Sequence, residues 1–264
     1  MLASLTLHLR PTHYDEVPVW LGRATQAWFL DSLRQVNPVL SKTLHDGSAL
    51  RPFTLSSLIP PTPPRGDLLQ LSPHETYTLR LTTLHADVSR ITLNALVERW
   101  LRGGITLHEQ PFHVERIDPL ETTTYQTLLQ HGAQATESRI RLRFESPTVF
   151  HRTGGIPVAM PLPDLVFGSL LTRWNTFAPQ RMAAEMQSLI RSGVRLEKAQ
   201  TTRQTVTFER SRKGAETGFV GDAVFCVDDP LALSGVHALA AYAPYCGAGV
   251  RTTVGLGQVT LLEN

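Results

Sequence analysis

In the stretch RIRLRF, residues 139–144, every second residue is an arginine and the residues between them are Ile, Leu and Phe. A period of two residues predicts a β-strand with one apolar face and one basic face. The basic face consists of Arg139, Arg141 and Arg143, and such a stripe suits the backbone of a nucleic acid. Alternating charge on a solvated strand gives the same pattern, so both interpretations stay open.

Further along the chain, apolar spacing predicts a helix, two strands, a second helix and a last strand. These elements are a helix containing Phe167, Leu170, Leu171 and Trp174, strands near 204–210 and 217–227, a helix near 230–242 and a strand near 251–262. Together with the strand at 139–144 they give the order βαββαβ, which is that of a ferredoxin-like domain.

The first half of the chain predicts the same order of elements. It contains a strand at 2–10, a helix carrying Trp20, Ala24, Ala27 and Trp28 that Asn37-Pro38 interrupts, a short helical piece to Leu44, strands at 51–59 and 73–82, a helix at 87–101 and a strand at 105–116. We therefore expect an α+β protein of two tandem ferredoxin-like domains, at 1–117 and 138–264. A connector at 118–137 joins them, and a glycine-rich loop lies near the C-terminus.

The composition of the 264 residues is that of a globular protein able to bury a core, with 42% hydrophobic and 18% charged residues. The 25 basic and 23 acidic residues leave a net charge of +2, which is too small by itself to indicate a nucleic-acid-binding protein. Only three of the basic residues are lysines, and the guanidinium groups of the other 22 suit bidentate phosphate contacts. A GC-rich genome produces the same bias.

No segment of the sequence has the pattern of a signal peptide or a membrane span, so we expect a soluble, cytoplasmic protein without membrane association. The two cysteines, Cys226 and Cys246, have neither CxxC spacing nor neighbouring metal ligands. We expect both to be core thiols, and we expect no metal site and no cofactor.

The segment YCGAGVRTTVGLGQVTLL, residues 245–262, is rich in glycine and has an arginine at its centre. The residues in question are Gly247, Gly249, Arg251, Gly255 and Gly257. A glycine-rich loop lets backbone N–H groups approach a phosphate closely. Too few residues follow for a dinucleotide-binding βαβ unit, and no Gly-Lys-Ser/Thr marks a P-loop. A glycine hairpin or bulge before the last strand explains the same pattern.

Four segments together resemble a known family. GAGVRTTVGLGQV (247–259), GFVGDAVFCV (218–227) and FESPTVFHRTGGIPVAMPLPDLVFGSLLTRWN (144–175) resemble the C-terminal half of the CRISPR-associated, RAMP-type endoribonucleases that process repeat RNA. QVNPVLSKTLHDGSALRPFTLSSL (35–58) resembles the helix-loop-strand segment that holds their catalytic histidine. The resemblance implies two tandem ferredoxin-like domains with a cleft for repeat RNA.

The resemblance also implies a reaction. The 2′-hydroxyl of the RNA attacks the adjacent phosphate without a metal ion, leaving a 2′,3′-cyclic phosphate or 3′-phosphate and a 5′-hydroxyl end, and pre-crRNA becomes mature crRNA. This chemistry needs a base for the hydroxyl proton, an acid for the departing oxygen and cations that stabilise the transition state. Histidine suits both proton transfers because its ordinary pKa, about 6.5, lies near working pH.

The resemblance assigns the catalytic role to His45, which stands in LHDGSALRPFT at the position of the family's histidine. Without the resemblance, His45 is one of ten histidines and lies near the end of a helix. Arg51 falls where some members have a lysine. Its fixed charge can stabilise the transition state but cannot donate a proton, and a solvated arginine at a strand edge is the alternative.

Leu30 replaces the tyrosine that some members carry on the first helix. The second proton-transfer group is therefore open, and the candidates are Tyr14, Tyr245, His13 and His151. Another possibility is that His45 acts largely alone, and slow cleavage with retention of the product is our hypothesis.

The candidate RNA contacts lie in the C-terminal half of the chain. His151 and Arg152 follow the Ser146-Pro147 turn, where a loop at the mouth of the cleft can hold phosphate, although a polar surface loop is the alternative. The predicted RNA-binding residues are Arg139, Arg141, Arg143, His151, Arg152, Gly247, Gly249, Arg251, Gly255 and Gly257. Neither domain has an aromatic-rich RNA-stacking strand, which favours recognition of a hairpin by shape and backbone.

The expected partners are CRISPR repeat RNA, as pre-crRNA and crRNA, the proteins of a CRISPR effector complex, and a second copy of the chain. Two other functions stay open. One is a non-catalytic RNA-binding subunit of the same superfamily that holds crRNA in an effector complex. The other is a ferredoxin-like module that binds small molecules or proteins and has no role with RNA.

Overall fold

The computed structural model describes residues 1–46, 50–64, 66–208 and 214–263, and the side chains of residues 45 and 46 lie outside the described part. The chain forms two compact units. Unit 1 consists of Met1–Thr122 and Thr253–Gly255, and unit 2 consists of Thr123–Thr252 and Leu256–Asn264. No helix in the described part of the chain is long and apolar enough to cross a membrane.

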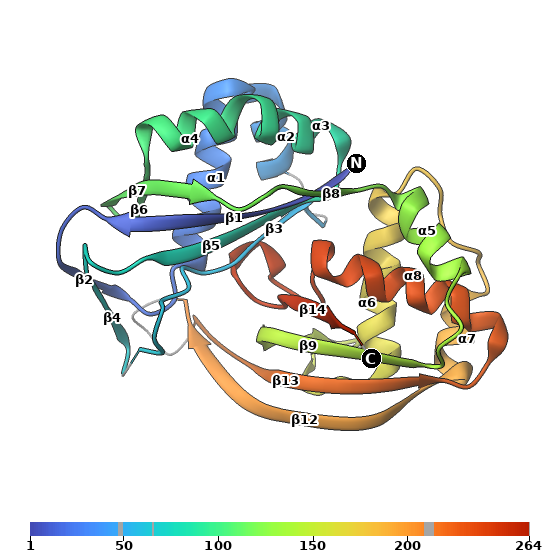
Figure 1. Ribbon diagram of the computed structural model, residues 1–264. Helices are drawn as coiled ribbons and strands as arrows, with labels where there is room; N and C mark the ends of the chain where they lie inside the picture. Colours follow the sequence, from blue (N-terminus) through green and yellow to red (C-terminus); the bar gives the residue numbers. More distant parts are fainter. Residues whose placement is uncertain (47–49, 65, 209–213, 264) are drawn as a thin grey trace. The chain divides into compact units, whose positions relative to one another are not determined.

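Unit 1 is an antiparallel sheet with its helices on one face (Figure 1). Its strands are β1 (Leu2–Pro11), β2 (Asp15–Pro18), β3 (Phe53–Leu55), β4 (Leu68–Leu71), β5 (Tyr77–Thr83), β6 (Ile105–Leu107), β7 (Gln110–Ile117) and β8 (Glu121–Thr123). Its helices are α1 (Gly22–Val36), α2 (Pro38–Asp46), and α3 (Ala86–Ile91), which continues through a π-helical turn (Thr92–Leu96) into α4 (Val97–Gly103). The strand order is β3-β5-β1-β7-β6, β8 pairs with β1, and β2 and β4 form a separate ribbon.

The alternating leucines of β1 build the core of unit 1. Leu5, Leu7 and Leu9 are buried, as the period of two residues predicts. Leu5 lies opposite Leu81, and Leu7 lies opposite Leu79, both on β5. Burial of each leucine side chain contributes about 1.5–3 kcal/mol relative to exposure. The helices pack against this apolar face of the sheet.

Asn37 separates α1 from α2, as the Asn37-Pro38 pair predicts. Its N–H donates to the carbonyl oxygen of Leu33 at 2.7 Å, where α1 ends. Its side-chain oxygen accepts a 2.9 Å hydrogen bond from the N–H of Leu40 and so caps α2. Pro38 is the first residue of α2, where an N–H group is not needed. The start of α2 is therefore fixed by local chemistry.

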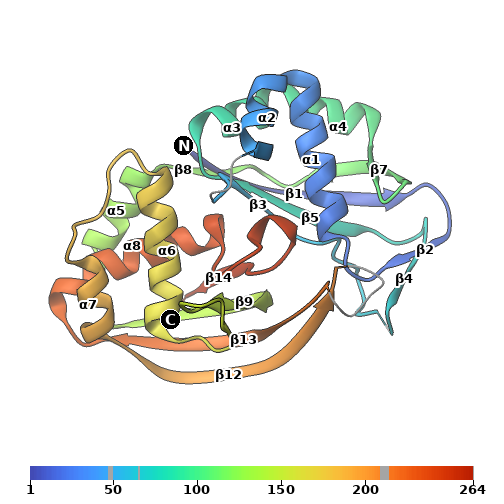
Figure 2. The same cartoon turned by 180° about the vertical axis from the view of Figure 1, so that it is seen from behind.

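Unit 2 is a second antiparallel sheet with helices on one face (Figures 1 and 2). Its strands are β9 (Arg139–Thr148), β10 (Phe150–His151), β11 (Pro157–Val158), β12 (Val194–Thr207), β13 (Ala215–Val227) and β14 (Val259–Leu262). Its helices are α5 (Tyr125–Ala133), α6 (Pro163–Phe177), α7 (Met186–Gly193) and α8 (Pro230–Cys246), and a short 3-10 turn, η3 (Thr252–Val254), precedes β14. The sheet has the order β12-β13-β9-β14, and β10 and β11 form a small hairpin.

The two sheets share one topology. In unit 1 the central strand β1 lies between β5 and β7. In unit 2 the central strand β9 lies between β13 and β14 in the same way. This is the ferredoxin-like arrangement of a βαββαβ chain. The prediction of two tandem ferredoxin-like units in an α+β protein is confirmed.

Some of the predicted strands differ from the structure, and two of them differ in kind. The strand expected at 105–116 is divided into β6 and β7, because His108 and Glu109 have φ angles of 49° and 66° and form a two-residue turn. The strand expected at 251–262 is wrong in its first part, because only β14 is extended and the residues before it form a turn and a loop.

The segment 118–137, predicted as a connector, contains β8 and α5. α5 packs closely on α8, since a Cβ added at Gly132 meets the carbonyl oxygen of Ser234 at 2.2 Å. The boundary between the units lies between Thr122 and Thr123. Most of this segment is therefore part of unit 2 and contributes a helix to it.

Candidate functional site

His45 lies in the last turn of α2, and its side chain is outside the described residues. α2 is fastened to α1 by Ser41, whose hydroxyl donates to the carbonyl oxygen of Leu30 at 2.9 Å. Leu30 packs against the core of unit 1, and an aliphatic side chain at this position cannot transfer a proton. Arg51 is half-buried and lies just before β3. His45 and Arg51 thus flank residues 47–49, which lie outside the described part.

The four candidates for the second proton-transfer group lie in different elements. His13 and Tyr14 belong to the loop between β1 and β2 of unit 1. Tyr14 is 67% exposed, and its ring lies edge-on to that of His74 with 6.0 Å between the ring centroids. Tyr245 lies near the end of α8 and His151 lies in β10, both in unit 2. The choice among these four residues stays a prediction.

The glycine-rich segment, residues 247–257, uses many of its N–H groups inside the protein. The N–H of Gly257, for example, donates to the carbonyl oxygen of Pro147 at 3.1 Å. The N–H groups with such internal acceptors, up to the residue that follows the segment, belong to Gly247, Ala248, Gly249, Val250, Leu256, Gly257 and Gln258. A phosphate cannot take these donors without breaking existing hydrogen bonds, so the packing favours a structural role for this part of the loop.

Close backbone packing explains why glycine stands in this segment. Gly249 and Gly257 have φ angles of 76° and 67°. An added Cβ meets the carbonyl oxygen of Val149 at 2.3 Å in the first case and that of Ala248 at 2.0 Å in the second. Any larger residue forces the backbone to move. These glycines therefore shape the loop, whatever the loop binds.

The tip of the segment, Thr253–Gly255, is counted with unit 1 because it packs on the start of α1. The indole Nε1 of Trp20 donates to the carbonyl oxygen of Val254 at 2.9 Å. The amide of Gln26 donates to the hydroxyl of Thr253 at 2.7 Å. The helix that carries Leu30 therefore also holds the tip of the glycine-rich segment.

A buried arginine of α6 supports the segment from within unit 2. Arg173 Nη2 donates to the carbonyl oxygen of Gly249 at 2.6 Å and lies 3.4 Å from Thr252 Oγ1. Burial lowers the pKa of Arg173. Sequence reasoning missed this residue, although an arginine three positions after the core residue Leu170 lies on the buried face of the helix.

Two arginines of the predicted basic stripe are held by carboxylates of neighbouring strands. Arg139 makes two hydrogen bonds to Glu197, at 2.8 and 2.7 Å. Arg143 makes two to Asp222, at 2.7 and 3.0 Å. These bonds lower the pKa values of both carboxyl groups. Arg141 lies on the same exposed face, so the stripe is only partly available to a polyanion.

Unit 2 brings together two predicted RNA-binding residues that are 100 positions apart in the sequence. Arg251 Nε lies 3.2 Å from Glu216 Oε2, and His151 Nε2 lies 3.7 Å from Glu216 Oε1. The guanidinium carbon of Arg251 lies 5.0 Å from the centroid of the Phe208 ring. Arg152, next to His151, is exposed. Neither Glu216 nor Phe208 was predicted, because no local pattern distinguishes them.

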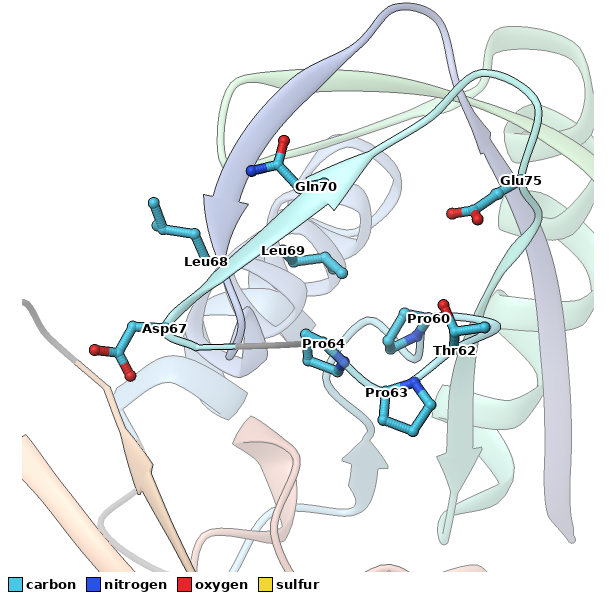
Figure 3. Close-up of a pocket in the computed structure, with 9 residues that line it drawn as sticks. All are labelled: Pro60, Thr62, Pro63, Pro64, Asp67, Leu68, Leu69, Gln70 and Glu75. Atoms are coloured by element: carbon cyan, nitrogen blue, oxygen red, sulfur yellow. The ribbon is translucent and has the colours of Figure 1, made fainter.

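A cavity of about 930 Å³ lies in unit 1 beside the proline-rich segment, and Figure 3 shows its lining. The lining residues are Pro60, Thr62, Pro63, Pro64, Asp67, Leu68, Leu69, Gln70 and Glu75. None of the predicted site residues is among them, and the charged side chains among them are acidic, which disfavours RNA phosphates. Across the described residues, no group of three or more His, Cys, Asp or Glu side chains is arranged to hold a metal ion.

Comparison with known proteins gives this geometry a context. Residues 142–259 match the family described as CRISPR-associated endoribonuclease Cas6. A Cas6 product complex superposes on the chain with a TM-score of 0.81 and 25% sequence identity, covering 99% of this chain and 100% of that one. Residues 142–259 thus carry the pattern of the Cas6 family, and the chain has the fold of a solved Cas6. The resemblance seen in the sequence is thus confirmed.

Other solved Cas6 structures share the fold at lower identity. Thermus thermophilus Cas6 is 23% identical, with a TM-score of 0.72 over 99% of this chain and 98% of that one. A Cas6-related protein from Pyrococcus furiosus is 12% identical, with a TM-score of 0.69 over the full length of both chains. None of the curated proteins compared with the chain matches its sequence.

Proposed function

We propose that the chain cleaves CRISPR repeat RNA at one phosphodiester bond and so converts pre-crRNA to mature crRNA. The observation that carries this proposal is the match of residues 142–259 to an endoribonuclease family, together with the end-to-end similarity to a Cas6 captured with product. A second Cas6 product complex, at 23% identity, and a complex with a substrate mimic have the same fold.

The proposed reaction is metal-independent transesterification. The 2′-oxygen of the RNA forms a bond to phosphorus as the bond from phosphorus to the 5′-oxygen breaks, which leaves a cyclic phosphate and a 5′-hydroxyl. A base accepts the 2′-hydroxyl proton and an acid protonates the 5′-oxygen. Because the nucleophile belongs to the RNA itself, proton transfer and charge stabilisation are the protein's tasks.

His45 is proposed as the main proton-transfer group and Arg51 as a fixed positive charge beside the reacting phosphate. Support for His45 comes from its place at the end of α2, which is fastened to α1, and from the resemblance of its flanking sequence to the family's catalytic segment. One solved Cas6 of the same fold is a mutant in which alanine replaces a histidine. With Leu30 unable to transfer protons, we expect slow cleavage.

The proposed RNA contacts are concentrated in unit 2. Arg251, His151 and Arg152 form the group best suited to phosphate, with Arg141 as a further exposed cation. The glycines of the loop are proposed to determine its shape and not to bind phosphate directly, because many of their N–H groups already donate to acceptors inside the protein. The protein is proposed to act in the cytoplasm, with effector-complex proteins or a second copy of the chain as further partners.

A second candidate function is a non-catalytic subunit that holds crRNA. Leu30 favours this function, because leucine stands where some family members have a tyrosine and cannot take part in acid–base chemistry. A solved structure with a TM-score of 0.64 and 15% identity is described as a RAMP protein that binds different RNA substrates. Binding of repeat RNA without any cleavage product supports this second function.

Replacement of His45 tests the proposal. His45→Ala is expected to abolish cleavage of a hairpin RNA copied from a CRISPR repeat of the same genome, while most of the RNA affinity is retained. His113→Ala, at an exposed position of β7, serves as the control and is expected to cleave like the wild type. Equal cleavage by the His45→Ala variant removes this residue from the mechanism.

A further inference from the structure

Two close contacts in unit 2 bring distant parts of the sequence to one place. Gly218 lets β13 lie against the end of β9, since a Cβ at this position meets the N–H nitrogen of Thr148 at 2.6 Å. The next residue of the chain, Val149, accepts a 3.0 Å hydrogen bond from the N–H of Val250. This hydrogen bond joins the chain just before the β10 hairpin to the glycine-rich segment. His151 and Arg251 follow closely on the two sides of it.

Glu216 lies two residues before Gly218 on β13 and faces the side chains of both His151 and Arg251. Its side chain is only 13% exposed, whereas those of His151 and Arg251 are 38% and 45% exposed. The carboxylate is thus the inner member of the group, and the side chains of His151 and Arg251 form its outer surface. A mostly buried carboxylate that contacts two more exposed side chains fixes where they point.

Arg251 is constrained on three sides. Its φ angle of 58° lies in the left-handed region, which residues other than glycine seldom adopt. Its Nε edge faces Glu216, and its guanidinium lies over the Phe208 ring. The edge formed by the two Nη atoms then matches the bidentate geometry of a phosphate.

We infer that Glu216 is a positioning residue, which holds Arg251 and His151 as one binding site for an RNA phosphodiester. The inference rests on the proposed function and names a residue that the family resemblance did not. Glu216 does not itself contact the RNA. It restricts the arginine to one orientation, so that less conformational entropy is lost when the phosphate binds.

The test is the affinity of purified variants for a repeat hairpin RNA that carries a 2′-deoxy group at the cleavage site, measured over a range of salt concentrations. Glu216→Gln is expected to raise Kd by about fivefold or more and to reduce the salt dependence by about one phosphate contact. The Glu216→Gln change is expected to have little further effect in an Arg251→Ala background. Asp228→Asn is the matched control, because Asp228 pairs with Arg195 Nε at the opposite end of the same β12–β13 ladder.

An unchanged or lower Kd for Glu216→Gln, with the wild type binding RNA, overturns the inference and leaves the proposed function intact. If wild-type protein binds no RNA, both fail. Should Glu216→Gln not fold, as judged by circular dichroism, Arg251→Lys decides the question. Lysine keeps the charge but cannot face a carboxylate and a phosphate with two separate edges, so a loss of affinity is expected and wild-type affinity overturns the inference.

Discussion

Arg173 Nη2 donates a 2.6 Å hydrogen bond to the carbonyl oxygen of Gly249 from a buried position. Its other described acceptors are the carbonyl oxygen of Ser169 and the hydroxyl of Thr252, so none of them is a carboxylate. A buried charge is costly unless it is hydrogen-bonded, and here its acceptors are neutral groups. The glycine-rich segment is therefore held by a residue of α6, as well as by its own backbone.

Replacement of Arg173 is expected to destabilise unit 2. Arg173→Ala leaves the Gly249 carbonyl oxygen without this donor and opens a cavity, which is expected to lower the free energy of unfolding by about 2–4 kcal/mol. Urea denaturation measures the change. Arg181→Ala, at an exposed position, is the control and is expected to change stability little. Equal stability of the two variants contradicts the supporting role of Arg173.

Arg251→Gly is expected to stabilise the protein while weakening RNA binding. Glycine adopts a φ of 58° without strain, so the free energy of unfolding is expected to rise by about 0.5–1 kcal/mol. Loss of the guanidinium removes the phosphate contact, so Kd for repeat RNA rises. Thermal unfolding and RNA binding on the same preparation give both values. A variant that loses stability and keeps its affinity shows that Arg251 serves the fold.

Two glycines with similar backbone angles are expected to respond differently to alanine. Gly257 and Gly154 have φ angles of 67° and 84°, but an added Cβ meets Ala248 O at 2.0 Å in the first case and nothing within 4 Å in the second. Gly154→Ala is expected to cost about 1 kcal/mol from backbone strain alone. Gly257→Ala is expected to lower the free energy of unfolding by about 3 kcal/mol or more, because the neighbouring backbone must move to admit the Cβ. Similar losses refute the packing explanation of the glycine-rich segment.

Arg143→Gln is expected to change RNA affinity little, to within about twofold, because Asp222 already takes both of its hydrogen bonds. Arg251→Gln is expected to weaken binding clearly. Filter binding of a repeat hairpin at several salt concentrations compares the two variants. A larger loss for Arg143→Gln shows that the basic stripe of β9 contacts the RNA despite its ion pairs.

The fold was predictable where apolar residues alternate or recur with the helical period. β1 and β9 each bury every second residue along part of their length, and their pattern places both βαββαβ units in the sequence. β12 begins at Val194, yet its start was not predicted, because most side chains of this edge strand are exposed and carry no period. Patterning thus locates strands with one buried face and misses a solvated edge.

The candidate site was predictable only in part. His151 and Arg251 were singled out from separate loops, but their shared partner, Glu216, depends on strand register and on close packing at Gly218. The pairing of Arg139 with Glu197 likewise joins residues on β9 and β12, which are separated in the sheet by β13. A pattern within one strand gives the positions of its cations and cannot give the carboxylates that neutralise them.

The most direct test of the central claim is cleavage in EDTA. Purified wild-type protein is incubated with an end-labelled repeat hairpin RNA and with a copy that carries one 2′-deoxy group at the nucleotide before the cut. A single cut in the all-ribose RNA, with a cyclic or 3′-phosphate end, and no cut in the deoxy copy is the predicted result. Cleavage of the deoxy copy, or cleavage that requires added metal, contradicts the proposed chemistry, and binding without a cut favours the crRNA-holding function.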